Sequence, residues 1–209
     1  IMAERYVITL GRECGAGATY IAQHLSKELG IPYYDKDIFR MVSDKSGVLE
    51  EFFHVNSERP GNNLLYKLVK DLKPADQKPS LGKDIVSPDN LFRFQSELIR
   101  ELADNESCII IGRCADYVLK DHDNCVHVFV CGDMDSKVQR MMHSYSLEES
   151  AAVERIKETD KQRKKYYSYY TGGDWEAASN YDLCLNTGDM TIEEAAEQIL
   201  FYLKQKHFV

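Results

Sequence analysis

The chain has 209 residues, of which 44 % are hydrophobic, and a net charge of −8. That length suits one α/β domain with a small insertion better than two independent domains, the hydrophobic share excludes wholesale disorder, and the acidic balance argues against a general DNA or RNA binder. No apolar run approaches the roughly 20 residues that cross a bilayer and no basic-then-apolar leader opens the chain, so we expect neither a membrane span nor a secretory leader.

The first predicted strand, residues 5–10, runs into a glycine-rich loop and then into a helix over residues 18–29. Gly11, Gly15 and Gly17 let the backbone curl until successive N–H groups point at one spot, which the positive end of the helix also faces. This layout predicts a phosphate-binding loop, although a tight strand-to-helix turn has similar glycine spacing. The residues assigned to ATP or phosphate binding are Gly11, Arg12, Glu13, Cys14, Gly15, Ala16, Gly17, Ala18, Thr19 and Tyr20.

The usual phosphate loop carries a lysine after its last glycine, and Ala18 stands in that place here. The lysine normally bridges the outer phosphates and offsets charge that develops during phosphoryl transfer. The guanidinium of Arg12 is a candidate replacement, unless it forms an ion pair with Glu13 or another surface carboxylate. Thr19 or Tyr20 offers a hydroxyl for a magnesium-bound water.

Two carboxylates lie at the end of the second predicted strand, residues 31–35, and directly after it. Asp35 and Asp37 are placed to orient an acceptor or a magnesium-bound water, whereas the alternative for Asp35 is a cap for the next helix. Residues 57–88 then break the alternation of strands and helices. They hold four of the five prolines, which predicts a lid, a binding flap or local disorder.

A helix is predicted from Pro88, with its apolar residues spaced to form one buried stripe. The strand that follows, residues 107–112, ends directly before Arg113. A charged residue at that point lies in the crevice where open α/β sheets bind ligands, so we expect Arg113 to bind phosphate. The alternative is a strand-end arginine that points into solvent. The next predicted strand covers residues 126–130.

Residues 147–170 predict a long, highly charged helix. Asp160 and Arg163 are three residues apart and share one face of it, which fits either a functional pair or a plain intrahelical ion pair. The tyrosine-rich run at 166–170 favours packing of the helix end onto the domain over stacking on a base.

The last predicted strand, residues 181–186, precedes a helix that begins at Thr191, with Glu194 at the capping-box position. Strands that alternate with helices predict a parallel sheet. The predicted fold class is therefore α/β: a three-layer P-loop NTPase-type fold in which helices flank a five-stranded parallel sheet.

The six cysteines are scattered without a Cys-x-x-Cys pair, which favours reduced thiols in a cytoplasmic protein. For Cys14, the loop amides and Arg12 predict a lowered thiol pKa and easy oxidation. The spacing of His122, Cys125 and His127 is irregular and lacks an evident fourth ligand, so we expect no metal site built by a protein cluster.

Four stretches together resemble the cytidylate kinase-like family, relatives of bacterial CMP kinase among the P-loop nucleoside monophosphate kinases: residues 9–40, 109–119, 155–175 and 181–199. The resemblance implies ATP and Mg²⁺ as cofactors and a single domain over residues 1–209. It also implies an acceptor-binding insertion at about 36–88 and a closing lid at about 133–165. The sequence departs from CMP kinase itself at Ala18 and by one extra residue in the loop.

Combined with the residues already singled out, the resemblance gives a set of expected roles. The residues expected to bind the acceptor are Asp35, Asp37, Arg40 and Arg113. The residues expected to take part in catalysis are Arg12, Arg140, Asp160 and Arg163. We expect ATP-dependent phosphoryl transfer to a nucleoside monophosphate, with CMP or dCMP first.

Two alternatives stay open: a nucleotide-binding regulator of the same fold with weak or lost activity, and a kinase for another small metabolite. The expected partners are small-molecule nucleotides, not nucleic acid or membranes, and a homodimer is left open.

Overall fold

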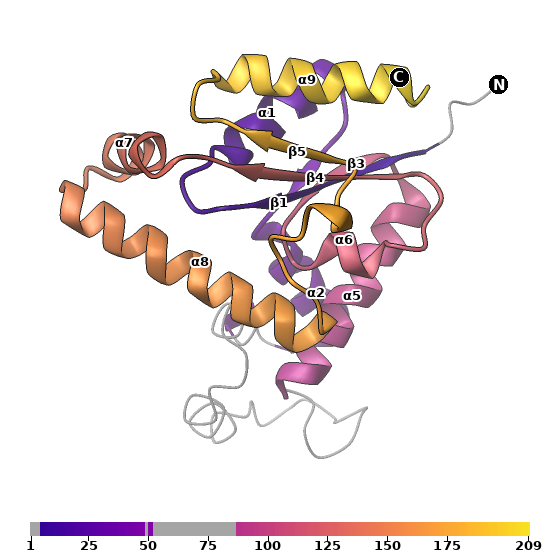
Figure 1. The fold of residues 1–209 in the computed structure, drawn as a ribbon. Coiled ribbons are helices and arrows are strands. Elements are labelled where there is room, and N and C mark those ends of the chain that lie inside the picture. Colours follow the sequence, from indigo (N-terminus) through magenta and orange to yellow (C-terminus); the bar gives the residue numbers. More distant parts are fainter. Residues whose placement is uncertain (1–4, 49, 52–86) are drawn as a thin grey trace.

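The computed structural model describes residues 5–48, 50–51 and 87–209, and a sheet of parallel strands forms its centre (Figure 1). The strand order across the sheet is β2-β3-β1-β4-β5. The strands are β1 Val7–Arg12, β2 Tyr33–Tyr34, β3 Cys108–Ile111, β4 Cys125–Cys131 and β5 Leu183–Asn186. All four pairings are parallel, which confirms the predicted five-stranded parallel sheet.

β1 runs two residues further than predicted. Gly11 and Arg12 belong to the strand, where they pair with Phe129 and Val130 of β4. Because β1 lies between β3 and β4, the loop that follows it leaves the middle of the sheet. β2 pairs with β3 alone and keeps only two of the five residues predicted for it.

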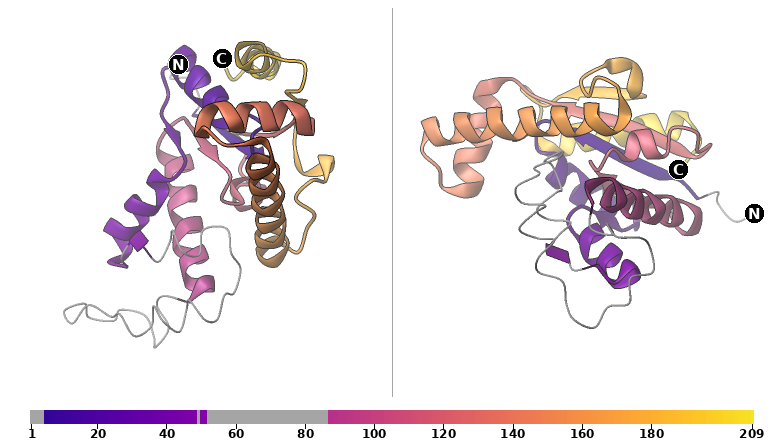
Figure 2. Two further views of the ribbon diagram at one scale, coloured as in Figure 1. Left: turned by 90° about the vertical axis from the view of Figure 1, so that its left-hand side faces the viewer. Right: turned by 90° about the horizontal axis from the view of Figure 1, so that it is seen from below.

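Helices cover both faces of the sheet and make three layers (Figures 1 and 2). In β3, Ile109 and Ile111 face one helical layer whereas Ile110 faces the other. This two-sided burial explains why the strand is apolar throughout. One layer contains α1 (Ala18–Leu29) and α9 (Ile192–Gln205), and the other contains α2 (Asp37–Ser46), α5 (Pro88–Asn105) and α6 (Ala115–Val118).

Two further helices lie toward the carboxyl ends of the strands. α7 (Met134–Tyr145) follows β4, and α8 (Glu149–Thr171) runs from α7 back toward α5 (Figure 1). Ile156 of α8 packs into an apolar cluster with α7. Tyr166 and Tyr167, near the end of α8, are buried in an aromatic cluster, which confirms the predicted packing role of the tyrosine run.

The helix ends carry the signals expected from the sequence. The Thr191 hydroxyl accepts from the Glu194 N–H, and the Glu194 carboxylate accepts from the Thr191 N–H, so the capping box of α9 is confirmed. α5 begins at Pro88, and α1 ends at Gly30, whose φ of 65° is left-handed. A single 3-10 turn, η1 (Ala178–Asn180), precedes β5.

Most of the proline-rich segment at 57–88, and with it most of the expected insertion at 36–88, lies outside the described residues. In the part of the chain that the structure describes, none of the helices is both long enough and apolar enough to span a bilayer.

Candidate active site

A cleft of about 670 Å³ opens at the carboxyl ends of the strands, the edge at which open parallel sheets bind ligands. It is lined by the loop after β1, the end of β2 with the start of α2, the residue after β3, and parts of α7 and α8. The predicted site residues that it gathers are Arg12, Glu13, Cys14, Gly15, Gly17, Ala18, Thr19, Tyr20, Asp35, Asp37, Arg113, Arg140 and Arg163.

Four predicted residues do not line this cleft: Gly11, Ala16, Arg40 and Asp160. Gly11 lies within β1, where a Cβ would be 3.1 Å from the ring of Tyr181. Arg40 is exposed on α2, and its guanidinium is 3.9 Å from the carboxylate of Asp37. Ala16 is a fully buried residue of the loop itself, and Asp160 contacts the loop from α8, as described below.

Two glycines give the loop its shape. Gly15 and Gly17 have φ values of 82° and 90°, in the left-handed region that residues with a Cβ disfavour. A Cβ on Gly15 would also lie 2.9 Å from the backbone oxygen of Lys137 in α7. Gly15 and Gly17 therefore serve the backbone turn, and Gly15 also allows the close packing of α7 on the loop.

The backbone N–H groups of the loop divide into two sets. Three are used inside the protein: Glu13 donates to the Val130 carbonyl, Cys14 to the Asp160 carboxylate and Ala16 to the Glu13 carbonyl. The second set meets no acceptor among the described residues and comprises Gly15, Gly17, Ala18 and Thr19. Because these N–H groups sit at the positive start of α1, they form a cradle suited to an anion.

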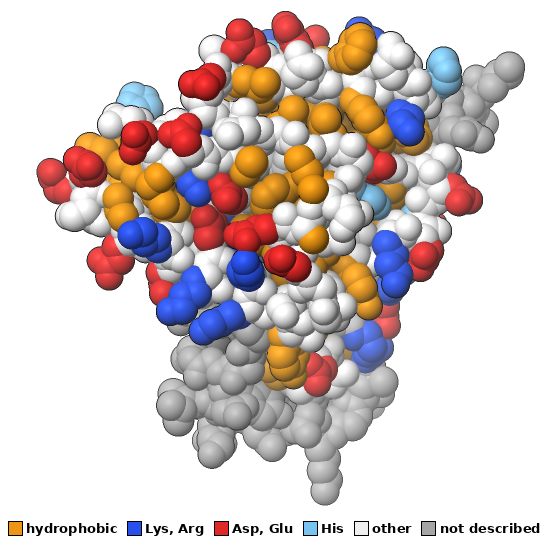
Figure 3. Space-filling model, viewed as in Figure 1, with side chains coloured by type: hydrophobic (Ala, Val, Ile, Leu, Met, Phe, Trp, Pro, Cys, Tyr) orange, Lys and Arg blue, Asp and Glu red, His pale blue; other side chains and the backbone are white. Residues whose placement is uncertain are grey.

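The cleft is rich in positive charge although the chain is acidic. Six cationic and three acidic side chains line it, whereas the whole chain carries −8. Lys and Arg side chains also gather over α8 on the outer surface (Figure 3). The Arg12 guanidinium lies against Gly112 so closely that no side chain would fit there. Arg163 donates from Nη1 to the Arg12 carbonyl oxygen at 3.3 Å, so Arg163 and the end of β1 meet in the cleft.

Arg113 occupies a strained turn after β3. Gly112, Arg113 and Cys114 have successive left-handed φ values of 69°, 64° and 53°, and each residue with a Cβ costs roughly 1–2 kcal/mol there. Arg113 is only 7 % exposed, which contradicts the solvent-pointing alternative. Its Nη2 is 3.5 Å from Asp35 Oδ1, and its guanidinium lies 4.1 Å from the centre of the Phe39 ring. Two residues predicted for acceptor binding are thus in contact.

Arg140 of α7 fastens two parts of the site. Its Nη1 donates to the Gly15 carbonyl at 3.3 Å and to Thr187 Oγ1 at 3.1 Å, and its Nη2 donates to the Thr187 carbonyl. Thr187 follows β5 and is fully buried, and its hydroxyl donates to the Ala16 carbonyl at 2.9 Å. Arg140 therefore ties α7 to the glycine-rich loop and to the segment after β5.

Asp160 and Arg163 contact the loop together from α8. Asp160 Oδ1 accepts from the Cys14 N–H at 2.6 Å and lies 3.9 Å from Arg163 Nη1. Partial burial raises the pKa of the Asp160 carboxyl, while the Cys14 hydrogen bond and the charges of Arg163 and Lys137 oppose the rise. The pair is thus more than the plain intrahelical ion pair that the spacing alone allows.

The predicted lowering of the Cys14 thiol pKa is wrong. Its thiol is buried and lies 4.0 Å from the sulfur of Met141. Burial raises the pKa of the thiol, and the nearby cation Arg163 lowers it by less. The expectation from amide dipoles and arginine charge neglected this desolvation, which disfavours the thiolate.

Sequence reasoning missed several residues that the structure brings to the site. Lys36, Phe39 and Arg155 line the cleft, and Lys137 and Thr187 are buried beside the loop. The position of Lys36 and Phe39 between Asp35 and Arg40 was an available signal. Nothing local marks Lys137 or Thr187, because their burial depends on contacts with a distant part of the chain.

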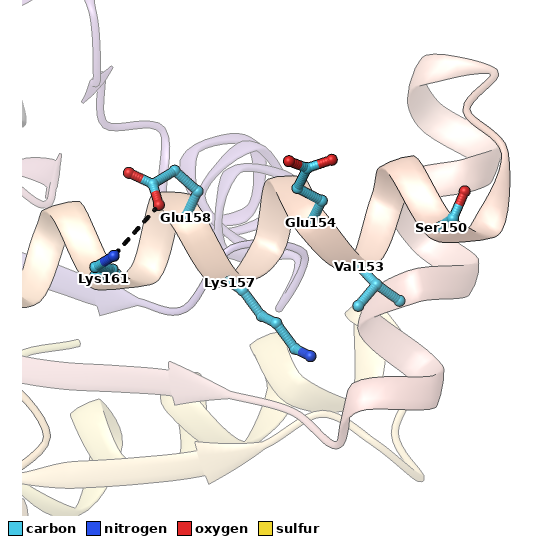
Figure 4. A pocket seen from close by; sticks show the side chains of 6 residues that line it. All are labelled: Ser150, Val153, Glu154, Lys157, Glu158 and Lys161. Atoms are coloured by element: carbon cyan, nitrogen blue, oxygen red, sulfur yellow. Dashed lines mark ion pairs between the residues drawn. The ribbon is translucent and has the colours of Figure 1, made fainter.

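A second hollow lies on the outer side of α8 (Figure 4). It is lined by Ser150, Val153, Glu154, Lys157, Glu158 and Lys161. All six come from one helix and do not converge on a ligand, so we assign no function to it. Across residues 5–48, 50–51 and 87–209, no group of His, Cys, Asp and Glu could hold a metal ion. His127 instead shares a 2.8 Å hydrogen bond with the Thr9 hydroxyl.

Comparisons with known sequences find a family model and relatives that cover most of the chain. The model of the cytidylate kinase-like family matches residues 7–189. A protein named cytidylate kinase from Methanobrevibacter smithii is 24 % identical over 199 residues, which cover 95 % of this chain and 98 % of that protein. A protein of the same name from Thermococcus kodakarensis is 26 % identical over 183 residues, which cover 87 % of this chain and 79 % of that protein.

Solved structures share the fold. A crystal structure of an uncharacterized protein from Eubacterium ventriosum has a TM-score of 0.69 at 27 % identity, covering 96 % of this chain and 99 % of that one. A shikimate kinase from Acinetobacter baumannii in complex with shikimate has a TM-score of 0.52 at 14 % identity, covering 98 % and 96 %. A gluconokinase from Sinorhizobium meliloti has a TM-score of 0.51 at 14 % identity, covering 97 % and 94 %. At 14 % identity the likeness shows the fold alone, which is that of the P-loop kinases.

Proposed function

Because the chain belongs to the cytidylate kinase-like family, we propose that it transfers the γ-phosphoryl group of ATP to a nucleoside monophosphate. CMP and dCMP are the first candidate acceptors, since relatives that align over nearly the whole chain are named cytidylate kinases. The reaction needs positioning and positive charge around the phosphates rather than covalent catalysis by a side chain.

The observation that carries the proposal is the set of N–H groups at Gly15, Gly17, Ala18 and Thr19. They meet no acceptor among the described residues, and they lie where the first helix begins. Backbone donors in this arrangement bind phosphate oxygens without help from any side chain. The loss of the lysine at position 18 therefore leaves the main anion-binding element in place.

Three arginines supply the positive charge in this proposal. Arg113, held by Asp35, grips the acceptor phosphate through its planar fork of N–H groups. Arg12, whose guanidinium lies against Gly112 next to Arg113, offsets charge on the transferring group in place of the absent lysine. Arg163 reaches the same end of β1 from α8 and adds a third charge.

Mg²⁺ supplies charge neutralisation on the phosphates when it is bound with ATP. Oxygen donors are the ligands that this cation prefers, directly or through water. The Thr19 hydroxyl and the carboxylates of Asp35 and Asp37 line the cleft and fit that preference.

A nucleotide-binding regulator is the second candidate, and two observations favour it. Ala18 removes the lysine of the usual loop. Asp160, a carboxylate of the chain itself, accepts from the Cys14 N–H and so takes one donor that phosphate would otherwise use. A kinase for another small metabolite would share the loop and differ on the acceptor side.

A phosphoryl-transfer screen tests the proposal. Purified protein with ATP and Mg²⁺ is offered each nucleoside monophosphate and its deoxy form, and ADP formation is measured. We expect turnover with CMP or dCMP that falls at least tenfold, at an acceptor concentration below KM, in an Arg113→Met variant, which controls for contaminating kinases. ATP binding without turnover of any acceptor favours the regulator. A protein that binds neither ATP nor ADP refutes the phosphate-binding role of the loop.

A further inference from the structure

We propose that Lys137 of α7 is the positioning residue that keeps the lysine-free phosphate loop able to accept an anion, by neutralising two carboxylates behind it. The inference rests on the nucleotide binding proposed above. It concerns a residue that comes from outside the loop and has no counterpart in the loop's own motif.

Lys137 is a buried cation between two acids. The residue is only 6 % exposed, although it is a lysine in the first turn of a surface helix. Its Nζ lies 2.8 Å from Glu13 Oε2 and 3.7 Å from Asp160 Oδ2. Glu13 belongs to the loop and Asp160 to α8, so one ammonium group joins three elements.

Each of the two carboxylates also accepts a hydrogen bond from a backbone N–H in the loop or beside it. Asp160 accepts from Cys14 at 2.6 Å, and Glu13 Oε2 accepts from Gly132 at 3.1 Å. The backbone of Lys137 itself packs on the loop, because a Cβ on Gly15 would meet its carbonyl oxygen at 2.9 Å. The loop, the end of β4 and α8 are therefore connected through one buried ammonium group.

The balance of charge around Lys137 links these contacts to anion binding. With Lys137 and the nearby Arg163, the two carboxylates form a set with two positive and two negative charges. Without Lys137, Glu13 loses its nearest cation. Glu13 lines the cleft that must accept phosphate, so its negative charge would then act on the ligand. The set then carries one net negative charge, and the Glu13 carboxylate would repel both Asp160 and the polyphosphate, since partly buried charges are weakly screened.

Lys137 itself does not line the cleft. It is therefore a positioning residue, in contrast to the usual loop lysine, which touches the phosphates. The competing explanation is a purely structural ion pair. That explanation predicts that loss of Lys137 lowers stability and leaves the nucleotide affinity of the folded protein unchanged.

The test is a double-variant cycle on the full chain, with Mg·ADP binding measured by calorimetry at a temperature where circular dichroism shows each variant folded. Lys137→Met removes the charge, and Lys137→Arg keeps it. Glu13→Gln keeps an acceptor for the Gly132 N–H but removes the negative charge. The double variant Glu13→Gln with Lys137→Met removes both partners, a change that is often tolerated in buried pairs.

We expect Lys137→Met to weaken ADP binding at least tenfold, Lys137→Arg to restore it to within threefold of the wild type, and the double variant to bind within threefold of Glu13→Gln alone. If Lys137→Met does not fold, the double variant alone decides. A folded double variant that binds more than tenfold weaker than Glu13→Gln overturns the inference, as does a folded Lys137→Met that binds like the wild type. A wild type that takes up no ADP overturns the proposed function itself and this inference with it.

Discussion

Replacing Gly15 by alanine tests whether the loop backbone is the anion site. Its φ of 82° places the new Cβ in the left-handed region, at a cost of roughly 1–2 kcal/mol. The same Cβ would lie 2.9 Å from the Lys137 carbonyl oxygen, so α7 or the loop must move by about 0.5 Å to reach an ordinary contact of 3.4 Å. Overpacking of this kind adds about 1–3 kcal/mol, which gives an expected total loss of about 2–5 kcal/mol.

The chain offers a matched control that measures the cost of the left-handed backbone alone. Gly30 ends α1 with a φ of 65°, and a Cβ there would meet nothing within 4 Å. Gly30→Ala should therefore lose only the roughly 1–2 kcal/mol of the left-handed backbone. Urea unfolding followed by circular dichroism measures both losses, and Mg·ADP titration measures binding in the same preparations.

The two variants should separate clearly in binding. A shift of about 0.5 Å should cost the loop at least one hydrogen bond to the charged phosphate, about 1.5 kcal/mol, and so weaken ADP binding by about tenfold in Gly15→Ala. Gly30→Ala should bind within twofold of the wild type. Equal stability losses in the two variants would show that α7 does not pack on the loop. Wild-type ADP affinity in folded Gly15→Ala would show that the anion binds elsewhere.

Four further outcomes are expected. Thr187→Val should lower the free energy of unfolding, measured in urea, by about 2 kcal/mol, because the buried Ala16 carbonyl loses its donor. Thr187→Ser keeps the hydroxyl and should lower the free energy of unfolding by less. The reverse order would contradict the hydrogen bond. Arg12→Ala should lower kcat far more than ADP affinity, and equal effects on both would deny it a transition-state role. Arg113→Met should raise the KM for the acceptor at least tenfold and leave the KM for ATP unchanged; an unchanged acceptor KM would remove Arg113 from that site. Burial lowers the pKa of His127 below 6.5, so the unfolded state binds the proton more tightly and stability falls as the pH drops through 6.5. His127→Gln should remove that part of the slope between pH 7.5 and 5, and an unchanged slope would assign it to other groups.

The sequence alone was sufficient for features that rest on local patterns. The helix predicted over residues 18–29 has those bounds in the structure, because its apolar spacing and its terminal glycine are both local signals. The apolar runs that became β3 and β4 were recognised because parallel strands buried on both faces have no polar face. β2 was overestimated, since only Tyr33 and Tyr34 pair with β3.

Features that depend on distant parts of the chain could not be predicted in the same way. Lys137 contacts Glu13 across 124 positions, and Thr187 contacts Ala16 across 171 positions. Neither residue belongs to a local motif that marks it as a partner of the loop. The error on Cys14 has the same origin, because its burial comes partly from Met141, 127 positions away.

These distant contacts give a physical reason why the loop can lack its lysine. Side chains from outside hold main-chain groups along residues 12–16: Arg163 binds the carbonyl of residue 12, Asp160 the N–H of residue 14, Arg140 the carbonyl of residue 15 and Thr187 the carbonyl of residue 16. Anion binding by N–H groups depends on the backbone being held in place before the ligand arrives, because ordering it afterwards costs entropy. A loop fixed at four points by three separate segments already has that order. Substitutions at Arg140 or Thr187 should therefore weaken nucleotide binding through the backbone, even though the buried Thr187 does not line the cleft.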